Sequence, residues 1–231
     1  MATYNVNEPA LGRITGFKID YAKLRRESAN FTDTGAGLPR MREIIAGVAS
    51  ALGVPTQFIE VVLNMECGYP EEKVCRSDMP RLGDGRKRLP DPRYPNPVEW
   101  AATLPQYREG AKLNRGAQIY IGVTQISWSF WHDVVNHKPM LEARVVLPQA
   151  WWMASLYWQI AAPFIYFDRY RSSFPQSTML VPSVVYALHQ QGPGGAQGNF
   201  SEIAGTQSGK TPTIIRAAQQ AMRGRTPPIF I

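Results

Sequence analysis

The sequence contains few of the side chains on which metal and redox chemistry depend, with 2 Cys and 3 His among 231 residues. His132, His137 and His189 lack the spacing of zinc ligands, so we expect neither a metal nor another cofactor. Cys67 and Cys75 are close enough in the chain to close a small disulfide loop. No Sec signal peptide is evident at the start of the sequence, so two free thiols are the default expectation.

Two further classes of site are missing. There is no Gly-x-Ser-x-Gly motif, which argues against the nucleophile elbow of the α/β-hydrolases. The segment from Gly205 to Thr211 has the composition of a phosphate-binding loop. It has one residue too few between its glycines, however, and no convincing strand precedes it. Nucleotide hydrolysis is therefore not expected.

Negative charge is also scarce relative to positive charge, and the formal net charge is +7. Such a chain favours polyanionic surroundings, which include nucleic acid, anionic membranes and acidic cell walls. The lysines and arginines are concentrated in a proline-rich stretch at about 70–113, without the interleaved aromatic residues of a base-stacking platform. We therefore expect no nucleic-acid partner.

Length and composition predict one mainly α domain, with helices bundled around a long central helix and a small β or irregular lobe. We interpret residues 1–38 as an N-terminal extension and 39–200 as the main domain. A long irregular basic insertion interrupts that domain at about 70–113. Residues 201–231 would form a C-terminal helix and tail. Loops as long as the insertion are often functional, although a solvated loop is an equally good interpretation.

Hydrophobic spacing predicts the helices. Apolar residues recur at helical spacing between Pro39 and Gly53, and again from about residue 55 to a glycine at 68. Further helices are expected at about 129–135, 182–191 and 212–223, and residues 119–126 have the composition of a short strand or turn.

Residues 145–167 contain no charged side chain, which raises the question of a membrane span. The stretch includes Pro148 and Pro163 as well as amides, and its aromatic residues are spread along its length. A membrane-spanning helix would gather its aromatic residues at the two ends. We therefore predict a buried central helix kinked at Pro163, and no membrane span.

Glu66 is the main candidate for chemistry. It shares a helical face with Ile59, Val62 and Leu63, so its carboxyl group should meet apolar packing. Desolvation and the negative end of the helix dipole would both raise its pKa, which suits a proton donor near neutral pH. The alternative is a glutamate on a frayed helix end that extends into solvent.

Two other motifs contain side chains that suit a sugar-binding groove. Gly122-Val-Thr-Gln125 offers close backbone approach and an amide that can both donate and accept hydrogen bonds, although it could equally be a turn with a solvent-facing glutamine. Tyr186-Ala-Leu-His189-Gln190-Gln-Gly192-Pro-Gly194 predicts a glycine-terminated helix. A lone histidine on a helix is usually structural or exposed.

In this order the three motifs resemble the lytic transglycosylases and goose-type lysozymes of the lysozyme superfamily, whose pattern is Glu-Ser-x-aromatic, Gly-Leu-Met-Gln, then Ala-Tyr-Asn-Ala-Gly. The likeness covers about residues 40–195. Cys67 replaces the usual serine, and His189 and Gln190 replace the usual tyrosine and asparagine. The run from Tyr120 to Ser127 is also similar to the Gly-x-x-Gln-Leu-Thr segment of plant-type chitinases.

The resemblance implies cleavage of the bond between N-acetylmuramic acid and N-acetylglucosamine, with Glu66 as catalytic acid and base. It implies that Gln125, Tyr120, Tyr186, His189 and Gln190 bind the substrate. The expected substrate partner is the peptidoglycan strand. Because no Sec signal peptide is evident, we expect the protein in a phage virion or tail, or in the host cytoplasm before it acts on the wall. Other phage virion or tail proteins are then expected partners.

Several alternatives stay open at this point. The chain could be a virion structural protein that keeps the fold with a degraded groove. Hydrolysis and anhydro-sugar formation are not distinguished by the sequence. The sequence also does not identify a second catalytic carboxylate, for which the insertion offers several candidates: Asp78, Asp84, Asp91, Glu99 and Glu109.

Overall fold

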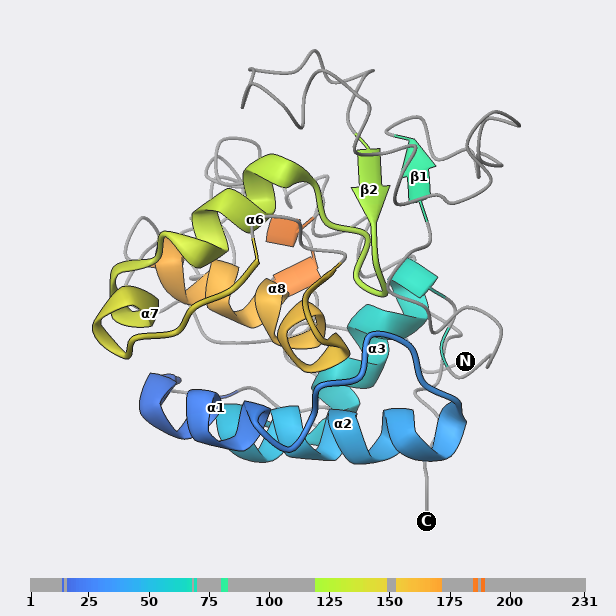
Figure 1. The fold of residues 1–231 in the computed structure, drawn as a ribbon, viewed down its shortest axis with the longest axis horizontal. Helices are drawn as coiled ribbons and strands as arrows, with labels where there is room; N and C mark the ends of the chain where they lie inside the picture. The colour runs from blue at the N-terminus through green and yellow to red at the C-terminus, as the bar shows by residue number, and fades with distance from the viewer. Residues whose placement is uncertain are drawn as a thin grey trace, which may run out of the picture.

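The computed structural model describes residues 14, 16–67, 69, 80–82, 119–148, 153–171, 185–186 and 188–189. This part of the chain is mainly helical, as predicted (Figure 1). Its elements are α1 (Tyr21–Ser28), α2 (Leu38–Leu52), α3 (Thr56–Cys67), β1 (Pro80–Leu82), β2 (Ile119–Ile121), α6 (Trp128–Val135), α7 (Lys138–Glu142) and α8 (Leu156–Tyr170). The two short strands pair antiparallel, with Arg81 opposite Tyr120.

Helix α2 begins and ends at the predicted residues. Gly37 precedes it in an extended conformation, and Pro39 lies in its first turn, where a missing N–H costs nothing. Gly53 ends it with a φ of 67°, a left-handed conformation that glycine adopts without strain. The predicted apolar face of the helix is buried in the core, including Ile44 and Val48.

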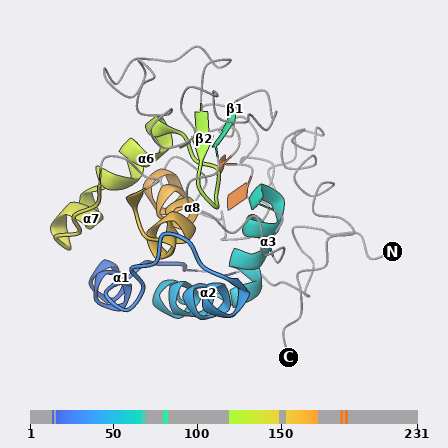
Figure 2. The ribbon, with the colours of Figure 1, turned by 45° about the vertical axis from the view of Figure 1, so that its right-hand side comes forward.

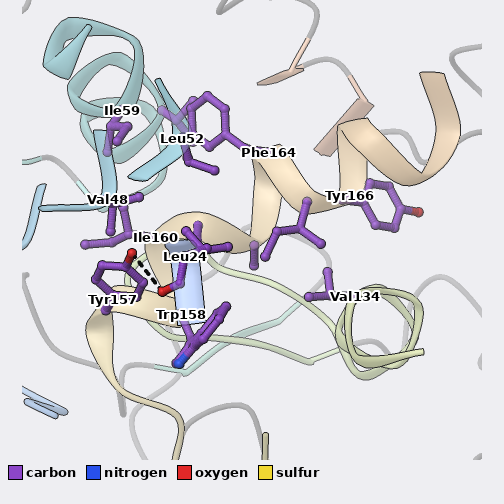
Figure 3. Packing of buried hydrophobic residues seen from close by; sticks show 14 of the residues in the cluster. Leu24, Val48, Leu52, Ile59, Val134, Tyr157, Trp158, Ile160, Phe164 and Tyr166 are labelled. Atoms are coloured by element: carbon purple, nitrogen blue, oxygen red, sulfur yellow. Dashed lines mark hydrogen bonds between the residues drawn. The ribbon is translucent and has the colours of Figure 1, made fainter. Parts of the chain in front are cut away.

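Helix α8 is the centre of the structure. Its side chains are buried from Leu156 to Phe167, and it packs against α2 and α6. Figure 3 shows side chains from α2, α3 and α6 gathered around Ile160 and Phe164. The predicted buried central helix is confirmed, but it begins at Leu156, after Ser155 in an extended conformation, and the chain is irregular at 145–148.

Among the described residues, no helix is both long enough and apolar enough to cross a bilayer. The uncharged face of α8 is covered by other helices of the same chain.

The region interpreted as an N-terminal extension contributes to the core where the structure describes it. Helix α1 packs against α2, and Phe17, Ile19, Tyr21 and Leu24 are buried. The Tyr157 hydroxyl of α8 donates a hydrogen bond of 3.2 Å to the Leu24 carbonyl, drawn as a dashed line in Figure 3. Residues 17–31 are thus part of the same packed unit as α8.

A polar cluster joins α1, α7 and the end of α8. Asp168 accepts hydrogen bonds from the Tyr21 hydroxyl at 2.7 Å, lies 3.1 Å from His137 Nε2 and pairs with Arg171. Burial opposes ionisation of Asp168, but the bonds from His137 and Tyr21 outweigh it, and the pKa of the carboxyl is lowered. The cluster pairs a buried carboxylate with groups from other helices and so holds three helices together.

The glycine at position 47, in the middle of α2, makes room for an aromatic ring. A Cβ atom at Gly47 would lie 2.4 Å from Cε2 of Phe31, whose ring stacks on Tyr157 with centroids 5.5 Å apart. Alanine is the better helix former by about 1 kcal/mol, but overpacking of this kind costs about 1–3 kcal/mol.

We therefore expect Gly47→Ala to lower the free energy of unfolding, measured by urea denaturation. In a Phe31→Ala background, where the ring is gone, the same substitution should instead be neutral or stabilising. A destabilisation of equal size in both backgrounds would contradict the steric explanation.

Glu60 on α3 is a second buried carboxyl group. Its residue is 5% exposed, and burial raises its pKa to about 7, against a partial opposing effect of Arg42. The folded state therefore holds a proton that the unfolded chain releases near pH 4.5. Stability attributable to this group falls as the pH rises from about 4.5 to 7 and stays low above that range.

We expect Glu60→Met to raise the free energy of unfolding at pH 7.5 by up to about 3 kcal/mol, the equivalent of the pKa shift. At pH 4.5 the gain should be much smaller, because the carboxyl is then protonated in the folded protein. Denaturation curves at both pH values measure this, with the exposed Glu142→Gln as control. An equal effect at the two pH values would show that burial of the charge is not the cause.

Candidate functional site

Three distant segments meet at one end of the helical core. They are the C-terminal turn of α3, the turn at 122–125 that follows β2, and the short helical segment at 185–186 and 188–189. Figure 2 shows this segment, in orange, between α8 and the C-terminal end of α3. Each segment contains one of the three motifs that the sequence singled out.

Glu66 and His189 meet in this group. Nε2 of His189 lies 3.5 Å from Oε1 of Glu66, and the Glu66 side chain is 12% exposed. Helix α3 buries the apolar residues that share its face, Val62 and Leu63. The carboxyl group is therefore held at the edge of the core and does not extend into solvent.

His189 is almost completely enclosed, with 4% of its side chain exposed. Burial lowers its pKa to about 4, and a hydrogen bond with the Thr124 backbone acts weakly in the opposite direction. The imidazole is thus uncharged above about pH 5. An imidazolium beside Glu66 would favour the ionised carboxylate, and the neutral ring supplies no such charge.

The turn at 122–125 has an unusual backbone. Gly122 has a φ of 94° and Gln125 a φ of 50°, and the second value is uncommon for a residue with a side chain. The Gln125 amide stabilises the turn from within, because its Nε2 donates a 2.6 Å hydrogen bond to the Gly122 carbonyl. Gln125 is 5% exposed, so at least part of its amide holds the turn in shape.

Helix α8 fixes this turn through Gln159, which is fully buried. The Gln159 side-chain oxygen accepts from the Val123 N–H at 3.4 Å, and its side-chain nitrogen donates to the Ala154 carbonyl at 2.9 Å. The Gln159 backbone carbonyl accepts from the Thr124 hydroxyl at 2.9 Å. Two neighbouring residues of the turn are thus tied to one residue of the central helix.

The proline predicted to kink this helix explains why that carbonyl is available. In a helix the carbonyl of residue 159 would accept from the N–H of residue 163, but residue 163 is Pro163, which has none. The helix continues through Pro163, and the Thr124 hydroxyl takes the place of the missing donor. A buried carbonyl without any donor would be costly.

The remaining predicted site residues are placed as follows. Tyr186 is 4% exposed, and its ring stacks on His189 with centroids 6.5 Å apart. Tyr120 lies in β2, but its side chain is outside the described residues. Gln190, the glycines of the third motif and the candidate second carboxylates of the insertion are also outside them.

Sequence reasoning missed three residues that build the site. Thr124 and Gln159 hold the turn, and the ring of Phe130 lies edge-on to His189, with centroids 5.1 Å apart. Gln159 did leave a signal, because it is an amide in an otherwise uncharged run. A buried glutamine needs hydrogen-bond partners, and this indicates a structural anchor.

We expect Thr124→Val to lower the free energy of unfolding by about 1–3 kcal/mol, because it leaves the Gln159 carbonyl without a donor. In a Pro163→Ala background the same substitution should cost less, since the new N–H at position 163 can bond that carbonyl. Chemical denaturation of the four proteins gives the coupling energy. The cycle is its own control, because the side-chain change is the same in both backgrounds, and equal costs would contradict the proposed role of Pro163.

The chain matched no protein-family model, no curated protein and no solved structure.

Proposed function

We propose that this protein cleaves the glycan strands of peptidoglycan between N-acetylmuramic acid and N-acetylglucosamine, with Glu66 as the acid and base. The single observation that carries the proposal is the meeting of Glu66 with His189, 123 residues later in the chain, at a 3.5 Å contact. Nothing in the local sequence requires these two motifs to be neighbours. Their proximity is what a common site requires.

The proposed reaction uses one carboxyl group twice. Protonated Glu66 gives its proton to the glycosidic oxygen, and the bond from that oxygen to the anomeric carbon of the muramic acid breaks. The resulting carboxylate then takes the proton of the muramic acid 6-hydroxyl as that oxygen bonds to the anomeric carbon. The products are a shortened strand and a 1,6-anhydro end, and Glu66 is again protonated.

The environment of Glu66 suits a proton donor. The side chain is 12% exposed, and the neighbouring imidazole is enclosed and neutral above about pH 5 because of its burial. No positive charge from His189 therefore stabilises the carboxylate form in that range. The opposite arrangement, a glutamate paired with an arginine, would hold the group ionised and unable to donate.

A structural role in a virion or tail is the second candidate. It is favoured by the Gln125 amide, whose nitrogen bonds the Gly122 carbonyl within its own turn. Tyr186 is also enclosed. A scaffold with a degraded groove would have such inward-facing residues and no wall-cleaving activity.

We expect Glu66→Gln to abolish peptidoglycan cleavage, because the amide cannot transfer the proton, while the fold is kept. Zymography on purified peptidoglycan measures activity, and circular dichroism checks the fold. For the wild-type protein, mass spectrometry of the released muropeptides should show the anhydro product, which is one water lighter than the hydrolytic product.

The matched control is Glu142→Gln on the exposed side of α7, which should cleave like the wild type. Full activity of the Glu66 variant would refute its catalytic role. A wild-type protein without any activity on peptidoglycan would favour the structural candidate.

A further inference from the structure

His189 is surrounded by its own chain on several sides. Phe130 of α6 lies edge-on to the imidazole at 5.1 Å, and Tyr186 stacks on it at 6.5 Å. The backbone of Thr124 bonds it from the turn. With 4% of the side chain exposed, little of the ring is left to contact a sugar.

The remaining polar contact of the imidazole is with Glu66. Nε2 of His189 lies 3.5 Å from Oε1 of Glu66. Among the described residues, two ionisable groups contact His189, Glu66 from α3 and Tyr186 from its own segment, whereas α6 contributes the apolar Phe130 and the turn contributes backbone. The ring is thus a neutral polar group placed against one carboxyl group.

The contacts behind His189 lead into the core of the protein. Thr124, whose backbone bonds the imidazole, is tied by its hydroxyl to Gln159, and Gln159 is fully buried in the central helix. A chain of contacts therefore runs from the core of the protein through the turn and the imidazole to the carboxyl group. Active sites depend on such support, because a displacement of about 1 Å can cost about 100-fold in rate.

We propose that His189 is a positioning residue, which fixes the carboxyl group of Glu66 and is itself held by the turn anchored at Gln159, and that it is not a sugar-binding residue. The inference rests on the proposed function for its kinetic consequence. It assigns His189 a different role from the substrate-binding role that the motif resemblance implied. A positioning residue affects the chemical step and leaves substrate affinity nearly unchanged.

Kinetics on soluble, uncross-linked glycan strands test the proposal. We expect His189→Leu to lower kcat by about 10- to 100-fold with KM within about 2-fold of the wild type, because the carboxyl group loses its support while the sugar contacts stay. His189→Gln keeps a neutral polar side chain and should recover a substantial part of kcat. His132→Gln, on the exposed side of α6, is the control and should behave like the wild type.

Two kinetic outcomes would overturn the proposal. One is an unchanged kcat in His189→Leu. The other is a raised KM with an unchanged kcat, which would indicate a sugar contact. Thermal unfolding of each variant accompanies the kinetics. If His189→Leu does not fold, a KM raised more than about 2-fold in His189→Gln overturns the proposal, and a lowered kcat at an unchanged KM supports it.

A second measurement does not depend on activity and separates failure of this inference from failure of the proposed function. The chain has 3 histidines, so the imidazole nitrogen signals of labelled protein are few, and loss of one set in His189→Gln assigns them. In Glu66→Gln the imidazole nitrogen shifts of His189 at neutral pH should move, whereas in Glu142→Gln they should stay, because the first substitution alters the group 3.5 Å from the ring.

Unchanged His189 nitrogen shifts in Glu66→Gln would overturn the contact, whatever the activity of the wild type. Altered His189 shifts in a protein that does not cleave peptidoglycan would leave the contact standing and reject only the enzymatic role.

Discussion

The turn that contains Thr124 is attached to the central helix at the position of one missing backbone hydrogen-bond donor. Pro163 cannot donate to the Gln159 carbonyl, and the Thr124 hydroxyl fills that position from a turn 35 residues earlier in the chain. Because an unsatisfied carbonyl in the core is costly, the turn is held where its hydroxyl can reach. The position of the proposed site thus depends on the free Gln159 carbonyl that Pro163 leaves in α8.

The other contacts of the site follow from that attachment. The fixed turn bonds the imidazole of His189 through the Thr124 backbone, and the imidazole contacts Glu66. Burial of the imidazole keeps it neutral above about pH 5. The same burial that stabilises the fold therefore sets the charge state of the group beside the proposed catalytic acid.

The buried polar groups of this chain differ in how well they are compensated. Asp168 is paired with His137, Tyr21 and Arg171, and its pKa is lowered. Glu60 has a pKa raised to about 7 by its burial. The first group stabilises the packing of three helices, whereas the second reduces stability as the pH rises through the range between its unfolded and folded pKa values.

Local patterns in the sequence determined the helices and the candidate residues. Apolar spacing and Gly53 fixed α2, and the uncharged run with its scattered aromatic residues indicated a buried helix, because these signals act over a few residues. Only the tertiary structure decided that residues 17–31 belong to the core, that Gln125 supports its own turn and that His189 faces Glu66. Those outcomes depend on contacts between segments far apart in the chain, whose geometry is set by the packing of whole helices around α8.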